Sequence, residues 1–272
     1  MRQNEFPCDI ILLAGQSNAA GNGRGEVAHP FLPDERILLM KDTHPVCYRQ
    51  DEQGNNYLDV LSPTTFSVDV AEERLADGQP MGNLVFSFAR HYVKNHLADG
   101  RKLLIIHAAV GGTGFARHEW GVGDCLFCRM TDMLKEALAY HPDNRLCAIL
   151  WHQGEHDAFE QAELTPAKKT AFYEEQLGAL KAEVRTRFHA EKVPFVCGGF
   201  CDEWRRENQT SCDAIYLAYR HLCEEDPYMR FVETEGLTSN RQQTGNDDNI
   251  HFSRPALYRL GELYFGAYEE LR

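Results

Sequence analysis

The chain has 272 residues, of which 43% are hydrophobic and 25% charged, so it can bury one sizeable core. Its formal net charge of −13 disfavours nucleic acid and anionic membrane surfaces as partners, because both are negatively charged themselves. The apolar run Ile10 to Ala14 is too short for a signal-peptide core or a membrane span. Nine cysteines without secretory context favour free thiols. We therefore expect a cytoplasmic protein with a single domain over residues 1–272.

Short runs rich in β-branched residues or leucine alternate with longer amphipathic stretches, which is typical of a parallel sheet with helices on both faces. The expected strands are 9–14, 37–40, 102–109, 146–151, 193–198 and 229–233. The expected helices are 81–96, 124–140, one that begins after Thr165-Pro166 and one that begins after Ser253. The stretch 43–80 is long, polar and poorly periodic, so we interpret it as an irregular surface segment or as part of a substrate rim.

Ligands of open parallel sheets bind beyond the carboxyl ends of the strands, so the loops after the predicted strands are the first places to examine. The first strand leads directly into the sequence Gly-Gln-Ser-Asn at 15–18. A serine on such a tight strand-to-helix turn exposes its Oγ and leaves its own N–H free, which makes Ser17 a candidate nucleophile and oxyanion donor. An ordinary helix cap or a phosphate-binding loop is the alternative, although the spacing matches neither GxGxxG nor GxxxxGK[ST], and Ser17 is not in GxSxG.

Two further loops carry candidate oxyanion donors. The sequence VGGTG at 110–114 offers backbone N–H groups that could converge on an anion, although a plain flexible loop is the commoner outcome. The sequence HQGEHD at 152–157 is unusually dense in polar side chains. A buried Gln153 amide could donate to a developing oxyanion, while Glu155 and Asp157 could orient neighbouring groups or brace the loop. Its two histidines are also conceivable metal ligands, but less favoured ones.

A candidate base and its partner lie just before the last predicted helix, in the sequence DDNIH at 247–251. A carboxylate three residues before a histidine can accept a hydrogen bond from Nδ1–H and leave Nε2 to take a proton from a serine hydroxyl. Asp248 fits this role for His251 better than Asp247, whose offset and side-chain direction differ. A simple turn before a helix cap is the alternative. Together, the four loops supply a complete set of groups for acyl transfer.

These four blocks resemble those of the SGNH hydrolases, in particular the branch similar to sialate O-acetylesterases and acetylxylan esterases. The matching strings are GQSN at 15–18, GGT at 111–113, WHQGE at 151–155 and DxxH at 248–251, which together span most of the chain. The resemblance implies a flavodoxin-like α/β fold, a three-layer α/β/α sandwich with a central parallel sheet. It also implies a carboxylic ester hydrolase that removes acetyl groups from carbohydrates and needs no metal or other cofactor.

The resemblance assigns Ser17, Asp248 and His251 to a catalytic triad. The oxyanion hole would comprise the Ser17 N–H, a glycine of the second block, for which we choose Gly112, and the Gln153 side chain. The supporting or substrate-binding residues would be Gln16, Asn18, Gly111, Thr113 and Glu155. The segment Gly82-Asn83 also resembles a family position near the site. Two positions depart from the family pattern: Ala19 stands where methionine is frequent, and His156 stands where serine is frequent.

Two rival interpretations remain open. Cys125, Cys128, Cys197 and Cys201 could hold a structural zinc ion, although cysteine is commonly a small buried hydrophobe. Alternatively, the chain is a carbohydrate-binding protein that keeps the esterase fold without turnover. The expected partner in either carbohydrate hypothesis is a small acetylated sugar, and the oligomeric state is not predicted. Phe115, Trp120 and Trp204 could stack on a sugar ring or pack in the core.

Overall fold

The computed structural model describes residues 6–44, 46–61, 65–160 and 163–272, and its central element is a seven-stranded sheet. The strand order is β11-β10-β9-β1-β8-β2-β5, and all neighbours are parallel except β2 and β5. The strands are β1 (Cys8–Gly15), β2 (Ile37–Asp42), β5 (Phe66–Val70), β8 (Lys102–His107), β9 (Arg145–His152), β10 (Phe195–Gly198) and β11 (Met229–Val232). Every residue of β1 is buried, as expected for a strand covered on both faces.

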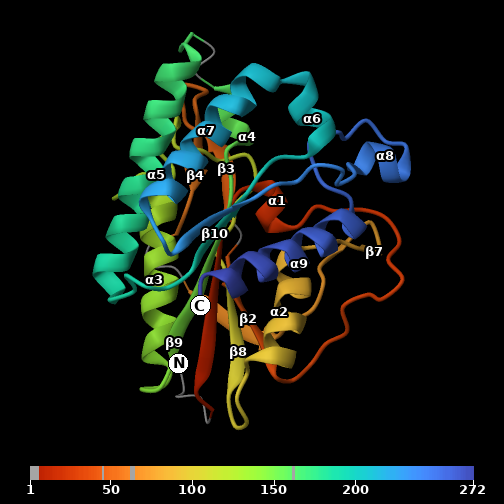
Figure 1. The fold of residues 1–272 in the computed structure, drawn as a ribbon, viewed down its shortest axis with the longest axis vertical. Helices are drawn as coiled ribbons and strands as arrows, with labels where there is room; N and C mark the ends of the chain where they lie inside the picture. The colour runs from red at the N-terminus through yellow and green to blue at the C-terminus, as the bar shows by residue number, and fades with distance from the viewer. Residues whose placement is uncertain (1–5, 45, 62–64, 161–162) are drawn as a thin grey trace.

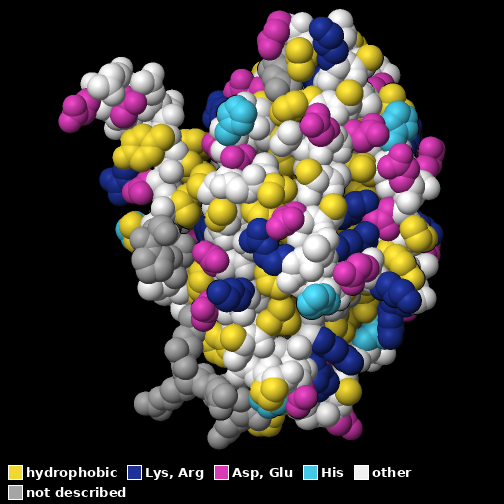
Figure 2. Space-filling model, turned by 90° about the vertical axis from the view of Figure 1, so that its left-hand side faces the viewer, with side chains coloured by type: hydrophobic (Ala, Val, Ile, Leu, Met, Phe, Trp, Pro, Cys, Tyr) yellow, Lys and Arg dark blue, Asp and Glu magenta, His cyan; other side chains and the backbone are white. Residues whose placement is uncertain are grey.

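Helices cover both faces of this sheet, which gives three layers (Figure 1). On one face, α2 (Leu84–Asn95) packs against α9 (Arg254–Glu270). On the other face lie α3 (Cys125–Ala139), α5 (Pro166–Phe188) and α7 (Gln209–Glu225), with α5 packed against α7. Figure 2 looks onto the side of α3 and α5, where acidic and basic side chains are interspersed. In the described residues, every helix is too short or too polar to span a bilayer.

Shorter elements form the connections. The helices α1 (Ser17–Ala20), α4 (Glu155–Phe159), α6 (Asp202–Glu207) and α8 (Asn240–Thr244) lie at the upper end of the sheet in Figure 1. Two hairpins project from the stretch before α2, one formed by β3 (Cys47–Gln50) and β4 (Asn56–Asp59), the other by β6 (Leu75–Ala76) and β7 (Gln79–Pro80).

The expected α/β class, all six expected strands and all four expected helices are confirmed, with ends that differ by a few residues. The described part of the stretch 43–80 is more regular than expected, because it contains the two hairpins and the edge strand β5 as well as loops, while residues 45 and 62–64 lie outside the described residues. Its interpretation as part of a substrate rim stays a prediction. Of the strands described in this stretch, only β5 joins the main sheet, and it does so antiparallel at the edge, where one side of a strand stays exposed. Ser253 caps α9 by accepting a hydrogen bond from the Ala256 N–H at 3.2 Å.

A buried ion cluster fixes the amino end of the sheet. Asp9 is fully buried in β1, where its carboxylate accepts hydrogen bonds from Arg101 Nε and Arg145 Nε, each at 2.8 Å, and from the Tyr92 hydroxyl at 2.8 Å. Burial alone would raise the pKa of Asp9, but the two guanidinium groups and the phenol outweigh it and lower this pKa. Asp9 therefore stays charged inside an otherwise apolar strand.

Candidate active site

The loops identified in the sequence follow three adjacent strands. The sheet places β9, β1 and β8 side by side, and their carboxyl ends lead into Gln153, Ser17 and the glycine run, respectively. After β8 the chain crosses over β1 to form β9, so the strand order reverses at β1. Open α/β sheets bind ligands at such a reversal, because the loops diverge there and leave a crevice.

Ser17 is held on a tight turn between β1 and α1. Gly15 adopts a φ of +129°, and its backbone lies so close to β9 that a Cβ there would be 2.1 Å from the His152 carbonyl oxygen. The Gln16 N–H then donates to that same carbonyl at 3.0 Å. Ser17 follows as the first residue of α1 and is 8% exposed. The turn therefore fixes the serine at the end of the central strand while a small part of it remains accessible.

Asp248 and His251 form the expected pair. His251 Nδ1 lies 2.9 Å from both carboxylate oxygens of Asp248, and the His251 N–H donates to Oδ1 at 3.1 Å. Asn240 donates from Nδ2 to Asp248 Oδ2 at 2.9 Å. Partial burial alone would raise the pKa of Asp248, but the hydrogen bonds from His251 and Asn240 outweigh it and lower this pKa to about 2. Asp247, the rival orienter, is exposed and has no such contact with His251 in the described structure.

Asn18 ties the serine turn to the histidine loop. Its Nδ2 donates to Glu155 Oε1 at 2.6 Å and to the Ile250 carbonyl at 3.2 Å, and its Oδ1 accepts from the Phe252 N–H at 3.0 Å. The residues on both sides of His251 are thus fastened to the residue after Ser17. Within the described residues, Ser17 and His251 share no direct hydrogen bond, and catalytic hydrogen bonds often tighten only when substrate binds.

Gln153 is the centre of a buried network. Its Nε2 lies 2.6 Å from Asp157 Oδ2, 3.1 Å from the Thr113 carbonyl and 3.2 Å from Gln16 Oε1, while its Oε1 accepts from the Tyr173 hydroxyl at 2.8 Å. Two amide hydrogens are therefore shared among three acceptors. A donation from Gln153 to an oxyanion requires that one of these hydrogen bonds is exchanged.

The glycine run lies directly against the serine. A Cβ built on Gly111 would be 3.5 Å from Ser17 Cβ, which is ordinary contact, whereas one on Gly112 would meet nothing within 4 Å. Gly112 has a φ of +73°, a conformation that favours glycine. Thr113 closes the turn because its Oγ1 donates to the Val110 carbonyl at 2.7 Å. Gly111 thus lies beside Ser17, and Gly112 and Thr113 follow it in the same turn.

Behind Ser17 lie a buried glutamate and a buried histidine. Glu155 is fully buried, its Oε2 has no hydrogen-bond partner in the described residues, and burial raises its pKa. His152 Nδ1 lies 2.8 Å from the Tyr264 hydroxyl, and burial lowers the pKa of this imidazole to about 3. The low pKa leaves the His152 imidazole neutral at physiological pH, and burial favours the neutral form of Glu155 as well.

Several other predicted residues occupy positions around this centre. His156 donates its N–H to Gln16 Oε1 at 3.1 Å, and its Nε2 lies 3.2 Å from Glu160 Oε1. Asn83 donates to the Ala19 carbonyl at 2.9 Å, so it contacts α1 from the start of α2. Asn240, the first residue of α8, was missed as a partner of Asp248, because no spacing motif links it to a residue eight positions later.

The aromatic candidates for sugar stacking are core residues. Phe115, Trp120 and Trp204 are 1%, 0% and 4% exposed, respectively. The Trp120 ring packs edge-on against Trp151, and its Nε1–H donates to Thr113 Oγ1 at 2.8 Å. The sugar-stacking interpretation of these three residues is therefore wrong, because their rings are enclosed by protein.

The cysteines of the zinc hypothesis are divided between two environments. Cys125 and Cys128 are exposed at the start of α3, whereas Cys197 and Cys201 are buried. Among the described residues, no three or more histidine, cysteine or carboxylate side chains gather in a group that could hold a metal ion.

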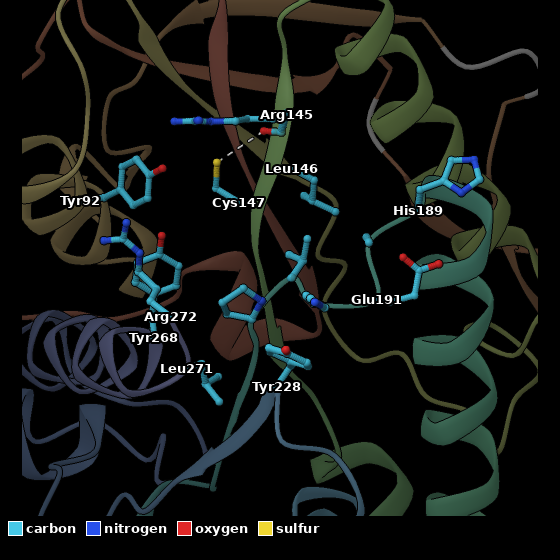
Figure 3. A pocket seen from close by; sticks show the side chains of 14 residues that line it. Tyr92, Arg145, Leu146, Cys147, His189, Glu191, Tyr228, Tyr268, Leu271 and Arg272 are labelled. Atoms are coloured by element: carbon cyan, nitrogen blue, oxygen red, sulfur yellow. Dashed lines mark hydrogen bonds between the residues drawn. The ribbon is translucent and has the colours of Figure 1, made fainter.

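A cavity of about 630 Å³ lies at the opposite end of the sheet, where β9 and β10 begin. Figure 3 shows Tyr92, Tyr268 and Arg272 on one side of it and His189 on the other, with the Cys147 Sγ 3.6 Å from the Arg145 carbonyl oxygen. Because parallel strands point away from this end, the cavity is separate from the candidate active site.

The fold is that of an α/β protein whose candidate site lies at the carboxyl ends of adjacent parallel strands. Residues 7–270 match the family model described as "Carbohydrate esterase, sialic acid-specific acetylesterase", and the chain belongs to this family. The protein is therefore a carbohydrate esterase. No curated protein sequence matches the chain.

Solved structures confirm the fold. The structure of NanS has a TM-score of 0.71 at 19% identity, covering 97% of each chain. A protein from Arabidopsis thaliana has a TM-score of 0.67 at 19% identity, covering 97% of this chain and 98% of its own. A carbohydrate acetylesterase from Xanthomonas citri has a TM-score of 0.52 at 15% identity, covering 94% of this chain and 55% of its own.

Proposed function

We propose that the protein is a serine esterase that hydrolyses O-acetyl esters of small carbohydrates through an acyl-enzyme on Ser17. The observation that carries this proposal is the Asp248–His251 pair, whose loop is fastened through Asn18 to the turn that presents Ser17. The Asp248 carboxylate holds the His251 Nδ1–H, which leaves Nε2 as the acceptor for the serine proton.

In the first step, Ser17 Oγ attacks the ester carbonyl carbon while His251 Nε2 takes the hydroxyl proton. Asp248 stabilises the resulting imidazolium, since its low pKa keeps it charged. The bond between the acyl carbon and the sugar oxygen then breaks, and His251 returns the proton to that oxygen. Water repeats the sequence on the acyl-enzyme, which releases acetate and restores Ser17.

The oxyanion of each tetrahedral intermediate would be stabilised by the Ser17 N–H, the Gly112 N–H and the Gln153 amide. The contact between Gly111 and Ser17 supports the placement of this glycine run beside the reacting carbon. Gln16, Asn18, Thr113 and Glu155 would support these groups through the hydrogen bonds described above.

The family description favours acetylated sialic acids, and acetylated xylo-oligosaccharides are the second substrate group we would test. We propose a small acetylated sugar as the partner, and neither nucleic acid nor a membrane. The departure at position 156 puts a histidine beside Gln16, so we expect this residue to affect the sugar preference.

The experiment compares the wild type with Ser17→Ala on 4-nitrophenyl acetate, acetylated sialic acids and acetylated xylo-oligosaccharides. The expected result is acetate release by the wild type that disappears in the variant, together with loss of labelling by a serine-directed fluorophosphonate. A well-folded wild type that releases acetate from none of these esters would contradict the proposal and favour a carbohydrate-binding protein.

A further inference from the structure

The β3–β4 hairpin reaches the glycine run beside Ser17. The Tyr48 hydroxyl lies 3.0 Å from the Gly112 carbonyl oxygen and 2.6 Å from Glu119 Oε1. Tyr48 is 38% exposed, whereas Glu119 is 5% exposed. Figure 1 shows this hairpin at the same end of the sheet as α1 and α4. A partly exposed side chain from the stretch 43–80 therefore contacts the backbone of the candidate oxyanion loop.

The same carboxylate also holds the other end of the loop. Glu119 Oε2 accepts a hydrogen bond from the Gly114 N–H at 2.8 Å. Tyr48 and Glu119 thus contact the carbonyl of Gly112 on one side of Thr113 and the N–H of Gly114 on the other side. Together they hold two positions of the loop, Gly112 and Gly114, which are two residues apart.

The loop needs such support because of its composition. Glycine has no side chain to restrict its backbone, and Gly112 adopts a φ of +73° with empty space where a Cβ would be. Its peptide orientation therefore depends on hydrogen bonds from its neighbours. Thr113 supplies one restraint through Val110, and the Tyr48 hydroxyl supplies another at the Gly112 carbonyl itself.

The hydrogen-bond chemistry explains why the tyrosine and the glutamate occur together. A phenol has one hydrogen and here faces two acceptors. Glu119 Oε2 accepts from the Gly114 N–H, which leaves Oε1 as the oxygen that faces Tyr48. The tyrosine hydrogen is shared between Glu119 Oε1 at 2.6 Å and the Gly112 carbonyl oxygen at 3.0 Å, so Glu119 holds the hydroxyl beside the glycine turn.

We propose that Tyr48 and Glu119 are positioning residues that fix the Gly111–Gly112 turn beside Ser17, so that its N–H groups face the oxyanion. This inference rests on the proposed esterase function. It assigns the β3–β4 hairpin a role in turnover without any contact to the reacting atoms.

The test measures kcat and KM for 4-nitrophenyl acetate in the wild type, Tyr48→Phe and Tyr57→Phe. Tyr57 is the matched control, because it is an exposed tyrosine on the other strand of the same hairpin and makes no contact with the glycine run in the described structure. We expect Tyr48→Phe to lower kcat by about tenfold or more, because misplacement of a catalytic group by about 1 Å can cost 100-fold, with KM nearly unchanged. Tyr57→Phe should match the wild type.

Glu119 is tested by Glu119→Gln and Glu119→Ala, with thermal melting of each variant as the check on folding. The glutamine can accept from the Gly114 N–H and donate to Tyr48, so we expect its kcat to stay within about threefold of the wild type. The alanine should lose about tenfold or more in kcat, as Tyr48→Phe does.

Three results would overturn the positioning role while leaving the esterase intact. These are a wild-type kcat in Tyr48→Phe, an equal loss in both tyrosine variants, and a loss confined to KM. An inactive wild type is a different outcome, because it removes the proposed function and this inference with it. Activity that depends on Ser17 but not on Tyr48 therefore separates the two failures.

Discussion

Asp157 carries a prediction about stability that follows from its burial. It is 1% exposed and accepts hydrogen bonds from Gln153 Nε2 at 2.6 Å, the Ala116 N–H at 2.7 Å and the Phe115 N–H at 3.1 Å. Burial raises the pKa of Asp157 to about 6 from its ordinary value of 3.8, although the three donors oppose this change. The folded protein therefore holds the Asp157 proton more tightly than the unfolded chain does.

The sign of the pH dependence follows from this difference. Between the two pKa values, the folded state binds one proton more than the unfolded state, so the free energy of unfolding falls as the pH rises. Each pH unit contributes about 1.36 kcal/mol, so the interval from 3.8 to about 6 corresponds to about 3 kcal/mol. This contribution is complete below pH 3.8 and is lost as the pH passes through about 6.

The substitution Asp157→Asn removes the titrating group at nearly constant size. We expect the free energy of unfolding of the variant, relative to the wild type, to rise by about 3 kcal/mol from about pH 4 to about pH 8. Urea unfolding at a series of pH values measures this difference, and it cancels groups that titrate equally in both proteins. Asp99→Asn, the same substitution at an exposed position, is the control.

The reasoning would be refuted by a difference between Asp157→Asn and the wild type that is constant across the series. A difference that changes in the opposite direction would refute it as well. The constant difference would mean that hydrogen bonding to the ionised carboxylate cancels its desolvation, and the opposite change would mean that hydrogen bonding outweighs it.

Two further predictions concern the site and its turn. Asp248→Asn should lower kcat for 4-nitrophenyl acetate by about 10³–10⁴ because the triad imidazole loses its orienting charge, whereas Asp247→Asn should keep the wild-type kcat; equal effects would remove Asp248 from the role. Gly15→Ala should destabilise the fold by about 4 kcal/mol or more in urea unfolding, because its Cβ would overlap the His152 carbonyl. Gly100→Ala, also at positive φ but with open space around the Cβ, should cost only about 1–2 kcal/mol, and similar losses at both positions would contradict the steric argument.

The sheet was predictable because its central strands are buried on both faces. The strands β1 and β8 contain the short apolar runs 10–14 and 103–106, whose length between turns is typical of buried strands. The edge strand β5 was not recognised, since its burial changes along the strand and polar residues interrupt it. Its pairing with β2 is a long-range contact, which local patterns do not encode.

The site shows the same division between local and long-range information. The three-residue spacing of Asp248 and His251 is local, so it could be interpreted from the sequence alone. The contact of Tyr48 with Gly112 joins residues 64 positions apart, and Asn18 contacts Glu155 across 137 positions. These contacts depend on how the strands are ordered in the sheet, and no spacing rule predicts them.

The pKa values of buried carboxylates are shifted in opposite directions at the two ends of the sheet. At the amino end, Asp9 meets two guanidinium groups, and its pKa is lowered. At the carboxyl end, Glu155 accepts from the Asn18 amide and Asp157 from the Gln153 amide and two backbone N–H groups, and burial raises the pKa of each. An additional full negative charge near Ser17 would oppose the oxyanion of the proposed mechanism, since charges interact strongly in a water-excluded site. Carboxylates whose pKa is raised carry less negative charge, so they can hold the loops in place with a smaller electrostatic penalty. Asp248, whose pKa is lowered, is the carboxylate that we propose as the charged partner of His251.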